Sequence, residues 1–153
     1  MSIPTQRLAE LGLTLPPVAK PLAAYTPAIT VGNQVWVSGQ LPLRDGKLVA
    51  TGRLGDAVEP AEGAEAAKVA ALNALAAVAD QAGGLDNVAR ILKAVVFVAS
   101  TTDFTAQPQV ANGASELLGE VFGTPHVRSA VGVAVLPIDA PVEVELVAEL
   151  AAR

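Results

Sequence analysis

The sequence predicts an α+β fold, with a sheet of about six strands and two long helices packed on one face of it. Residues 127–137 and 142–149 alternate apolar and other side chains with a period of two, which is typical of half-buried strands. Residues 59–82 instead repeat apolar side chains at helical spacing. At this length we expect residues 1–153 to form a single domain with its own core.

Residues 1–24 are predicted to form an N-terminal extension that contains one short helix. Residues 4–11 favour that helix, and Gly12 is expected to end it. Residues 16–21 contain three prolines, which fix φ and lack a backbone N–H, so an extended segment should follow.

Two hairpins are expected next, each turning at two residues of which one is glycine. The predicted pairs are residues 28–31 with 34–38 around Gly32 and Asn33, and residues 41–43 with 48–50 around Asp45 and Gly46.

The main helix is predicted over residues 59–82, where Gly83 and Gly84 close it. Its apolar stripe should pack on the sheet and carries no chemistry. The elements predicted after it are a helical turn at residues 85–88, a well-buried strand at 91–99, a second helix at 110–122, and a closing hairpin of residues 127–137 with 142–149.

The charge of the chain disfavours nucleic acid as a partner. The formal net charge is −5, there is no cluster of Lys and Arg, and aromatic residues make up only 3% of the chain. Nucleic-acid binders need a basic face for phosphates, and single-strand binders add aromatic stacking platforms. Ribonuclease activity is therefore the weaker interpretation of this sequence.

The apolar composition favours self-association. Hydrophobic residues make up 52% of the chain and charged residues 16%, which is a surplus for the surface of a monomer. No uncharged apolar run approaches the ~20 residues of a membrane span, and the N-terminus lacks a secretory signal, so a cytoplasmic protein is expected. The absence of cysteine excludes disulfides and thiolate metal sites.

Arg128 is the most distinctive residue of the closing strands. It shares one strand face with the small residues Ala130, Gly132 and Ala134, so little else would fill the space beside its guanidinium. It could be an ordinary exposed arginine at a sheet edge. It could also be a carboxylate receptor, because guanidinium matches a carboxylate bidentately and stays charged.

Several motifs together resemble the YjgF/RidA family of imine/enamine deaminases, which have a chorismate-mutase-like fold. The resemblance spans residues 25–148. The N-terminus of this chain is longer than in the archetypal deaminases, and in this the chain is most similar to a side branch of the family often labelled as endoribonucleases. The motifs that carry it are Tyr25, Gly32-Asn33, residues 35–42 (Val-Trp-Val-Ser-Gly-Gln-Leu-Pro), Asn112, residues 128–133 (Arg-Ser-Ala-Val-Gly-Val), Leu136-Pro137 and residues 142–145 (Val-Glu-Val-Glu).

This resemblance implies a role for each motif residue. Arg128 would hold the carboxylate of a 2-imino or 2-amino-enoic acid, and Glu143 would hydrogen-bond the attacking water. It also implies a homotrimer and a reaction without metal or organic cofactor. The other implied site residues are Tyr25 and Ser38 in the pocket, Gly39 with its backbone close to the ligand, Asn112, and Ala130, where archetypal members often carry cysteine.

The predicted closing hairpin places the site between subunits. If Val135 faces Val142, Arg128 and Glu143 lie about six residues apart along the ladder, or ~20 Å at ~3.3 Å per residue. They could not contact one small ligand within a single chain, so a neighbouring subunit would supply one of them.

Other functions stay open at this point. A trimer could bind small carboxylates or ketoacids through Arg128 without turnover, and an endoribonuclease or translation inhibitor is the alternative that the acidic charge disfavours. His126, the one histidine, is a candidate general base near neutral pH, although the motif does not require it.

Overall fold

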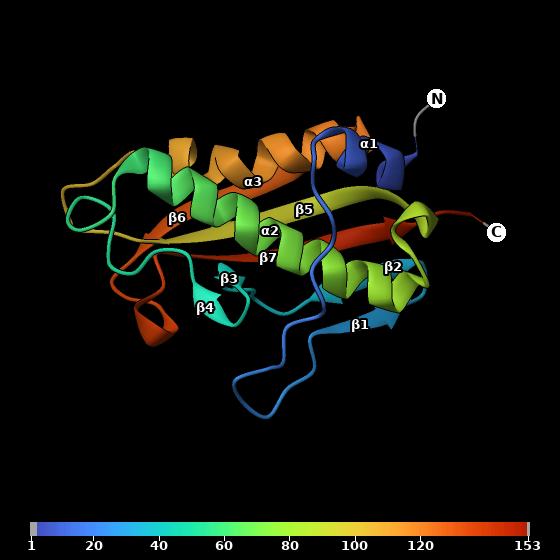
Figure 1. Cartoon of the computed structure of the whole chain (residues 1–153), viewed down its shortest axis with the longest axis horizontal. Coiled ribbons are helices and arrows are strands. Elements are labelled where there is room, and N and C mark those ends of the chain that lie inside the picture. The colour runs from blue at the N-terminus through green and yellow to red at the C-terminus, as the bar shows by residue number, and fades with distance from the viewer. Residues whose placement is uncertain (1–2, 153) are drawn as a thin grey trace.

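The computed structural model describes residues 3–152, and in them helices cover one face of a five-stranded mixed sheet (Figure 1). The strand order is β1-β2-β7-β5-β6, and β3 pairs with β4 in a separate two-stranded sheet. The elements are α1 (Pro4–Glu10), β1 (Ala28–Val31), β2 (Gln34–Val37), β3 (Leu43–Arg44), β4 (Lys47–Leu48), α2 (Pro60–Ala82), the 3₁₀ turn η1 (Leu85–Asn87), β5 (Val88–Ala99), α3 (Gln107–Phe122), β6 (Val127–Val133), the 3₁₀ turn η2 (Pro137–Asp139) and β7 (Val142–Leu150).

Both N-terminal hairpins are present, but the second is not part of the main sheet. β3 and β4 turn at Asp45 and Gly46, which have φ of 53° and 77°. Asn73 of α2 holds this hairpin, because its Nδ2 donates to the carbonyls of Leu41 and Leu43 at 2.9 Å each. The main sheet therefore has five strands rather than about six.

The predicted pairing of the two closing strands is wrong. β6 pairs in parallel with β5, with Ala94 opposite Arg128, and β7 pairs antiparallel with β5, with Phe97 opposite Glu143. β5 thus lies between the two strands that were expected to be neighbours. The reason is α3, which carries the chain back so that β6 runs in the same direction as β5, as in a βαβ unit. The prolines at 137 and 141 mark a connection that crosses a whole strand, not a tight hairpin.

Helix α2 is buried over most of its circumference, not along a single stripe. Every residue from position 69 to 78 is buried, including Asn73, because the sheet, α3 and the N-terminal extension all cover it. α3 can approach closely at Gly113, where a Cβ would lie 1.9 Å from the carbonyl oxygen of Ala64. The exposed residues of α2 lie in its first turns and at Asp80 and Gln81 near its end.

The N-terminal extension passes across α2 before it reaches β1 (Figure 1). Leu13, Leu15 and Val18 pack against the hydrophobic core from this side. α1 lies beside α3, and the backbone N–H of Thr5 donates to Asp86 at 2.9 Å. The extension therefore contributes to the core, and it delivers Tyr25 to the start of β1.

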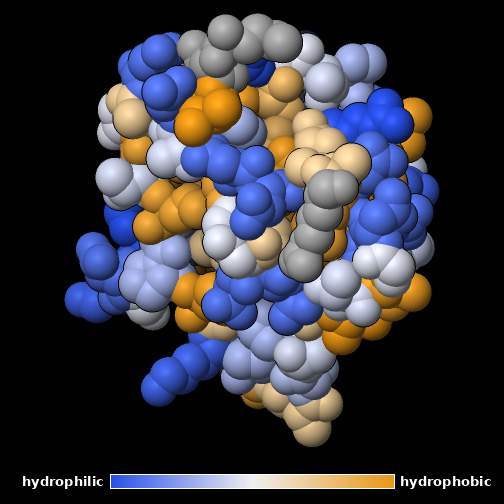
Figure 2. All heavy atoms as spheres, turned by 90° about the vertical axis from the view of Figure 1, so that its right-hand side faces the viewer, coloured by the Kyte–Doolittle hydropathy of each residue, from blue (hydrophilic) through white to orange (hydrophobic). Residues whose placement is uncertain are grey.

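The other face of the sheet carries apolar side chains that no element of residues 3–152 covers. The registers place Ile29, Trp36, Val147, Lys93 and Val127 in one row across the sheet. Trp36 is 50% exposed and Val127 66% exposed. At the end of the molecule where both termini lie, apolar and polar side chains instead alternate (Figure 2). None of the described helices is long and apolar enough to cross a membrane.

Candidate functional site

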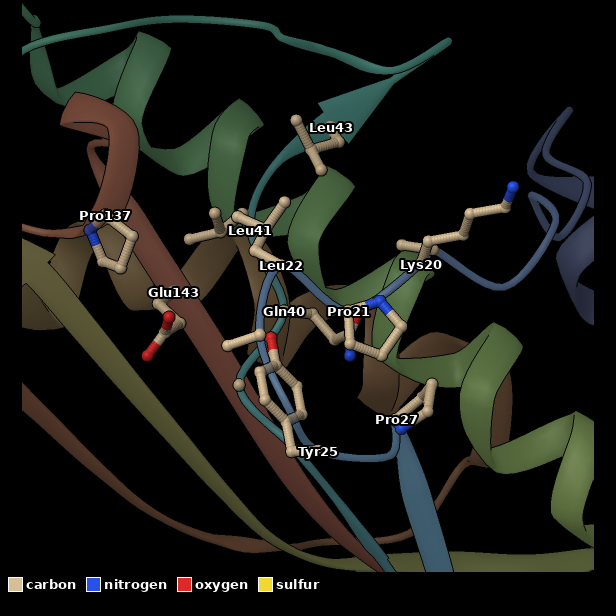
Figure 3. Close-up of a pocket in the computed structure, with 13 residues that line it drawn as sticks. Lys20, Pro21, Leu22, Tyr25, Pro27, Gln40, Leu41, Leu43, Pro137 and Glu143 are labelled. Atoms are coloured by element: carbon tan, nitrogen blue, oxygen red, sulfur yellow. The ribbon is translucent and has the colours of Figure 1, made fainter.

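Three of the predicted site residues line one cavity of about 230 Å³ (Figure 3). Glu143 comes from the start of β7, Gly39 from the chain after β2, and Tyr25 from the end of the N-terminal extension. They meet because Gln40 forms an isolated bridge with Val144, so the chain beyond β2 continues alongside β7. The cavity therefore lies where three distant parts of the sequence converge.

Gly39 makes room for Glu143. A Cβ on Gly39 would lie 2.7 Å from Cδ and Oε2 of Glu143, closer than real Cβ contacts allow. The resemblance had implied that the Gly39 backbone approaches a ligand; in this structure the Glu143 carboxylate occupies the space beside it. A side chain at this position would displace the carboxylate from the place it occupies.

The surroundings of Glu143 favour its protonated form. Burial raises the pKa of its carboxyl above the ordinary value, and the nearby charge of Glu145 raises it further. Both effects disfavour the charged form, the first by desolvation and the second by repulsion between like charges. A carboxyl with a raised pKa is a better proton acceptor and donor near neutral pH.

Tyr25 lies at the rim of the cavity, whereas Ser38 holds the segment that carries Tyr25. The Tyr25 side chain is 47% exposed and lines the cavity (Figure 3). The Ser38 hydroxyl donates to the carbonyl of Thr26 at 2.7 Å. Ser38 is thus engaged in fixing the residue next to Tyr25, and it is not among the residues that line the cavity.

Arg128 and Asn112 form a second cluster elsewhere in the chain. Nη1 of Arg128 donates to Oδ1 of Asn112 at 2.8 Å and to Oγ of Ser115 at 3.2 Å, and Nη2 donates to the carbonyl of Pro108 at 3.2 Å. These acceptors all belong to α3, which fixes the guanidinium over the edge strand β6. Ala130, on the same strand face, packs against the core instead.

His126 joins the Arg128 cluster through Ser115. Its Nε2 shares a hydrogen bond of 3.0 Å with the Ser115 hydroxyl, which also accepts from Arg128. Burial lowers the pKa of His126, and the charge of Arg128 lowers it further. The imidazole is therefore biased toward its neutral form. Ser115 was not singled out in the sequence, and its position three residues after Asn112, on the same helix face, could have indicated it.

Glu143 and Arg128 lie on opposite faces of the sheet. Arg128 shares the face of its β5 partner Ala94, which is the helix-covered face, whereas Glu143 shares the open face with Phe97. The strand β5 separates them as well. Within one chain the structure therefore keeps Glu143 and Arg128 apart, and the hairpin register from which their separation was predicted is wrong.

The cavity also contains residues that the motifs did not indicate. Leu22 and Leu43 line it together with the predicted residues and with Pro137 of the Leu136-Pro137 motif. Leu22 belongs to the N-terminal extension, which has no strand or helix periodicity to indicate that it faces a site. Only the proline-rich composition of this segment marked it as extended chain.

Comparison with known proteins shows the class to which this fold and site belong. Residues 5–150 match the family described as "YjgF/chorismate_mutase-like, putative endoribonuclease", so the chain belongs to this family. It is 44% identical to Protein TCP17 of Trypanosoma cruzi, over 94% of this chain and 91% of that protein. It also resembles the crystal structure of a "putative endoribonuclease" from Shewanella oneidensis, with a TM-score of 0.93 and 36% identity over 97% of this chain and all of that one.

Two more distant relatives have names that state a reaction or a ligand. A "2-iminobutanoate/2-iminopropanoate deaminase" of Dermatophagoides farinae is 29% identical over 87% of this chain and 91% of that protein. The crystal structure of Escherichia coli TdcF with bound serine has a TM-score of 0.64 and 26% identity, over 90% of this chain and 94% of that one.

Proposed function

We propose that this protein is a hydrolytic deaminase of reactive 2-imino and 2-amino-enoic acids, which it converts to 2-ketoacids. The observation that carries the proposal is the Glu143 carboxyl, half-buried over Gly39 in a small cavity that Tyr25 borders. Its raised pKa suits a group that must take up a proton and release it again. The deaminase from Dermatophagoides farinae and the serine-bound TdcF, both relatives, support the class of reaction and of ligand.

The reaction requires one water and proton transfers that one carboxyl can perform. The water oxygen bonds to C2 of the imine while a proton of the water passes to Glu143. The protonated Glu143 returns this proton to the nitrogen, which gives a carbinolamine. The Glu143 carboxylate then takes the proton of the new hydroxyl group and passes it to the amino nitrogen, so that the C–N bond breaks, ammonia leaves and the C=O bond of the 2-ketoacid forms. An enamine first takes up a proton at C3 and becomes the imine. Orientation of the water is the main contribution, because imines hydrolyse readily.

The substrate carboxylate would bind to Arg128 of a neighbouring subunit. Within one chain Arg128 lies on the other sheet face from Glu143, so a complete site requires two chains. The uncovered apolar face around Trp36 gives a physical reason for association. We propose the homotrimer that is typical of the family as the assembly that joins the two clusters.

The first experiment measures ammonia and ketoacid release from enzymatically generated 2-imino acids, with the wild type and Arg128→Ala. We expect acceleration over the uncatalysed rate by the wild type and its loss in the variant. Arg90→Ala is the matched control, because Arg90 pairs with Glu149 at 3.2 Å on the same molecule. The absence of acceleration with every imino acid would refute the deaminase proposal.

A second candidate function is carboxylate binding without turnover. The Arg128 cluster favours it, because three acceptors of α3 position the guanidinium independently of Glu143. Ketoacid binding that depends on Arg128, in a protein that accelerates no imine hydrolysis, would establish this alternative. Ribonuclease activity has less support, because the net charge of −5 opposes phosphate binding.

A further inference from the structure

We propose that the cavity beside Glu143 selects substrates by their side chain, with a preference for uncharged aliphatic side chains larger than methyl, and that the N-terminal extension forms the selecting wall. This inference rests on the proposed deaminase function and specifies its substrate class. The apolar wall residues come from three segments: Leu22 from the extension, Leu41 and Leu43 from the chain that leads into β3, and Pro137 from η2.

The wall of the cavity is apolar. Leu22, Leu41, Leu43 and Pro137 line the same cavity as Glu143 (Figure 3). A hydrocarbon side chain bound there removes apolar surface of both the substrate and the protein from water. Each buried methylene group should raise the affinity about fourfold. The wall therefore favours longer aliphatic side chains over methyl.

The position of Arg128 determines which end of the substrate enters this cavity. The guanidinium lies on the helix-covered sheet face of its own chain, so the carboxylate receptor is not part of the cavity wall. With the reacting carbon next to Glu143 and the carboxylate outside, the substrate side chain is what remains to fill the apolar space. A volume of about 230 Å³ is below the ~300 Å³ at which cavities for drug-sized ligands begin, and it suits a small branched acid.

Charged side chains are disfavoured in the same space. A second carboxylate in the substrate would lie beside the Glu143 carboxylate and meet like-charge repulsion. Lys20, the lysine of the wall, turns its ammonium away from Glu143 and toward the outside (Figure 3). It therefore does not compensate a buried anionic side chain.

The extension is positioned for selection rather than for chemistry. Leu15 and Val18 anchor it on the core, and Ser38 fixes its end at Thr26. Between these anchors Leu22 is 60% exposed and lines the cavity. A change at Leu22 should therefore alter the preference among substrates more than it alters the reaction itself.

The test compares kcat/KM for imino acids derived from alanine, 2-aminobutyrate, leucine and aspartate, in the wild type, Leu22→Asp and the control Leu11→Asp. Leu11 is a 39% exposed leucine of the same extension that does not line the cavity. We expect the leucine-derived imine to exceed the alanine-derived one by at least tenfold in the wild type and in Leu11→Asp. In Leu22→Asp this ratio should fall at least fivefold, whereas general damage to the fold would lower both rates and leave the ratio unchanged.

A binding arm separates failure of this inference from failure of the proposed function. Calorimetry with pyruvate and 4-methyl-2-oxopentanoate measures the same preference without turnover. Equal or stronger use and binding of the smaller compound, in a protein that does deaminate, would overturn the inference and leave the deaminase. The same preference for the larger ketoacid, lost in Leu22→Asp, in a protein that accelerates no imine hydrolysis, would support the cavity and refute the proposed reaction.

Discussion

The Glu143 cavity and the Arg128 cluster surround their charged side chains in opposite ways. The Arg128 guanidinium is satisfied by three acceptors on α3, so its orientation is fixed before any ligand arrives. The Glu143 carboxylate is instead held against an apolar wall and near Glu145, so its charged form is disfavoured. The Arg128 cluster fixes the orientation of a charged group, which suits recognition of a ligand. The Glu143 cavity raises the pKa of a carboxyl, which suits proton transfer.

The sharpest test of this contrast is Glu143→Gln, which keeps the shape and removes the proton acceptor. Deamination should fall by ~10²- to 10⁴-fold in kcat, the range for loss of a general acid–base group. Although its activity falls, the free energy of unfolding of Glu143→Gln should rise at high pH. Because the folded pKa is raised, the stability contributed by Glu143 is present below its unfolded pKa and is lost as pH rises through the folded value.

Glu143→Gln should therefore be more stable than the wild type at pH 8 and equally stable at pH 4. The melting temperature of the variant and of Glu149→Gln, a control on the same strand, checks this. A Glu143→Gln protein with unchanged kcat would remove proton transfer from the role of Glu143.

Mixed assemblies test whether the two clusters act across subunits. Arg128→Ala and Glu143→Gln are each expected to be nearly inactive alone. Co-expressed at equal levels with different affinity tags, they should regain about a quarter of wild-type sites, because random association pairs an intact Arg128 with an intact Glu143 from another chain at that frequency. In a trimer that carries both tags one of the three sites is intact, so purified doubly tagged assemblies should show about a third of the wild-type activity. No recovery in verified mixed assemblies would place both residues of one site on the same chain.

The smallest expected effect is that of Glu145, whose charge is the second cause of the raised pKa of Glu143. Glu145→Gln removes the repelling charge, so the pKa of Glu143 should fall and its charged, proton-accepting form should extend to lower pH. The pH profile of kcat/KM should shift toward acid, with roughly a two- to threefold gain on its acidic limb. The rate at high pH should not change. A shift toward alkaline pH would contradict the electrostatic account of this site.

Local rules predicted the elements well, whereas the pairing of the closing strands required information that no local pattern holds. The turn at Asp45 and Gly46 and the ends of α2 and α3 at glycines with positive φ follow from backbone sterics. β6 and β7 both alternate and are joined by a proline-marked connection, as hairpin strands would be. Their actual partner is β5, whose nearly continuous apolar sequence fits a central strand that needs a neighbour on each side.

The candidate site, like the fold, was predicted from the sequence only in part. The motif residues Tyr25, Gly39 and Glu143 do meet, and Arg128 meets Asn112. The separation of these two groups onto opposite faces depends on strand order, so it could not be derived from the motifs. The apolar wall around Leu22 could not be predicted either, because an extended segment without periodicity gives no indication of which side chains face inward.

The N-terminal extension also has a consequence for the order of folding during synthesis. α1 leaves the ribosome before the parts of the chain that it contacts: Thr5 bonds to Asp86, and Arg7 donates to the carbonyl of Val121 at 3.5 Å. At ~5–20 residues per second these partners follow seconds after α1. α1 is thus made well before it can dock, and α2 of the nascent chain lacks its contacts with α3 until α3 is complete.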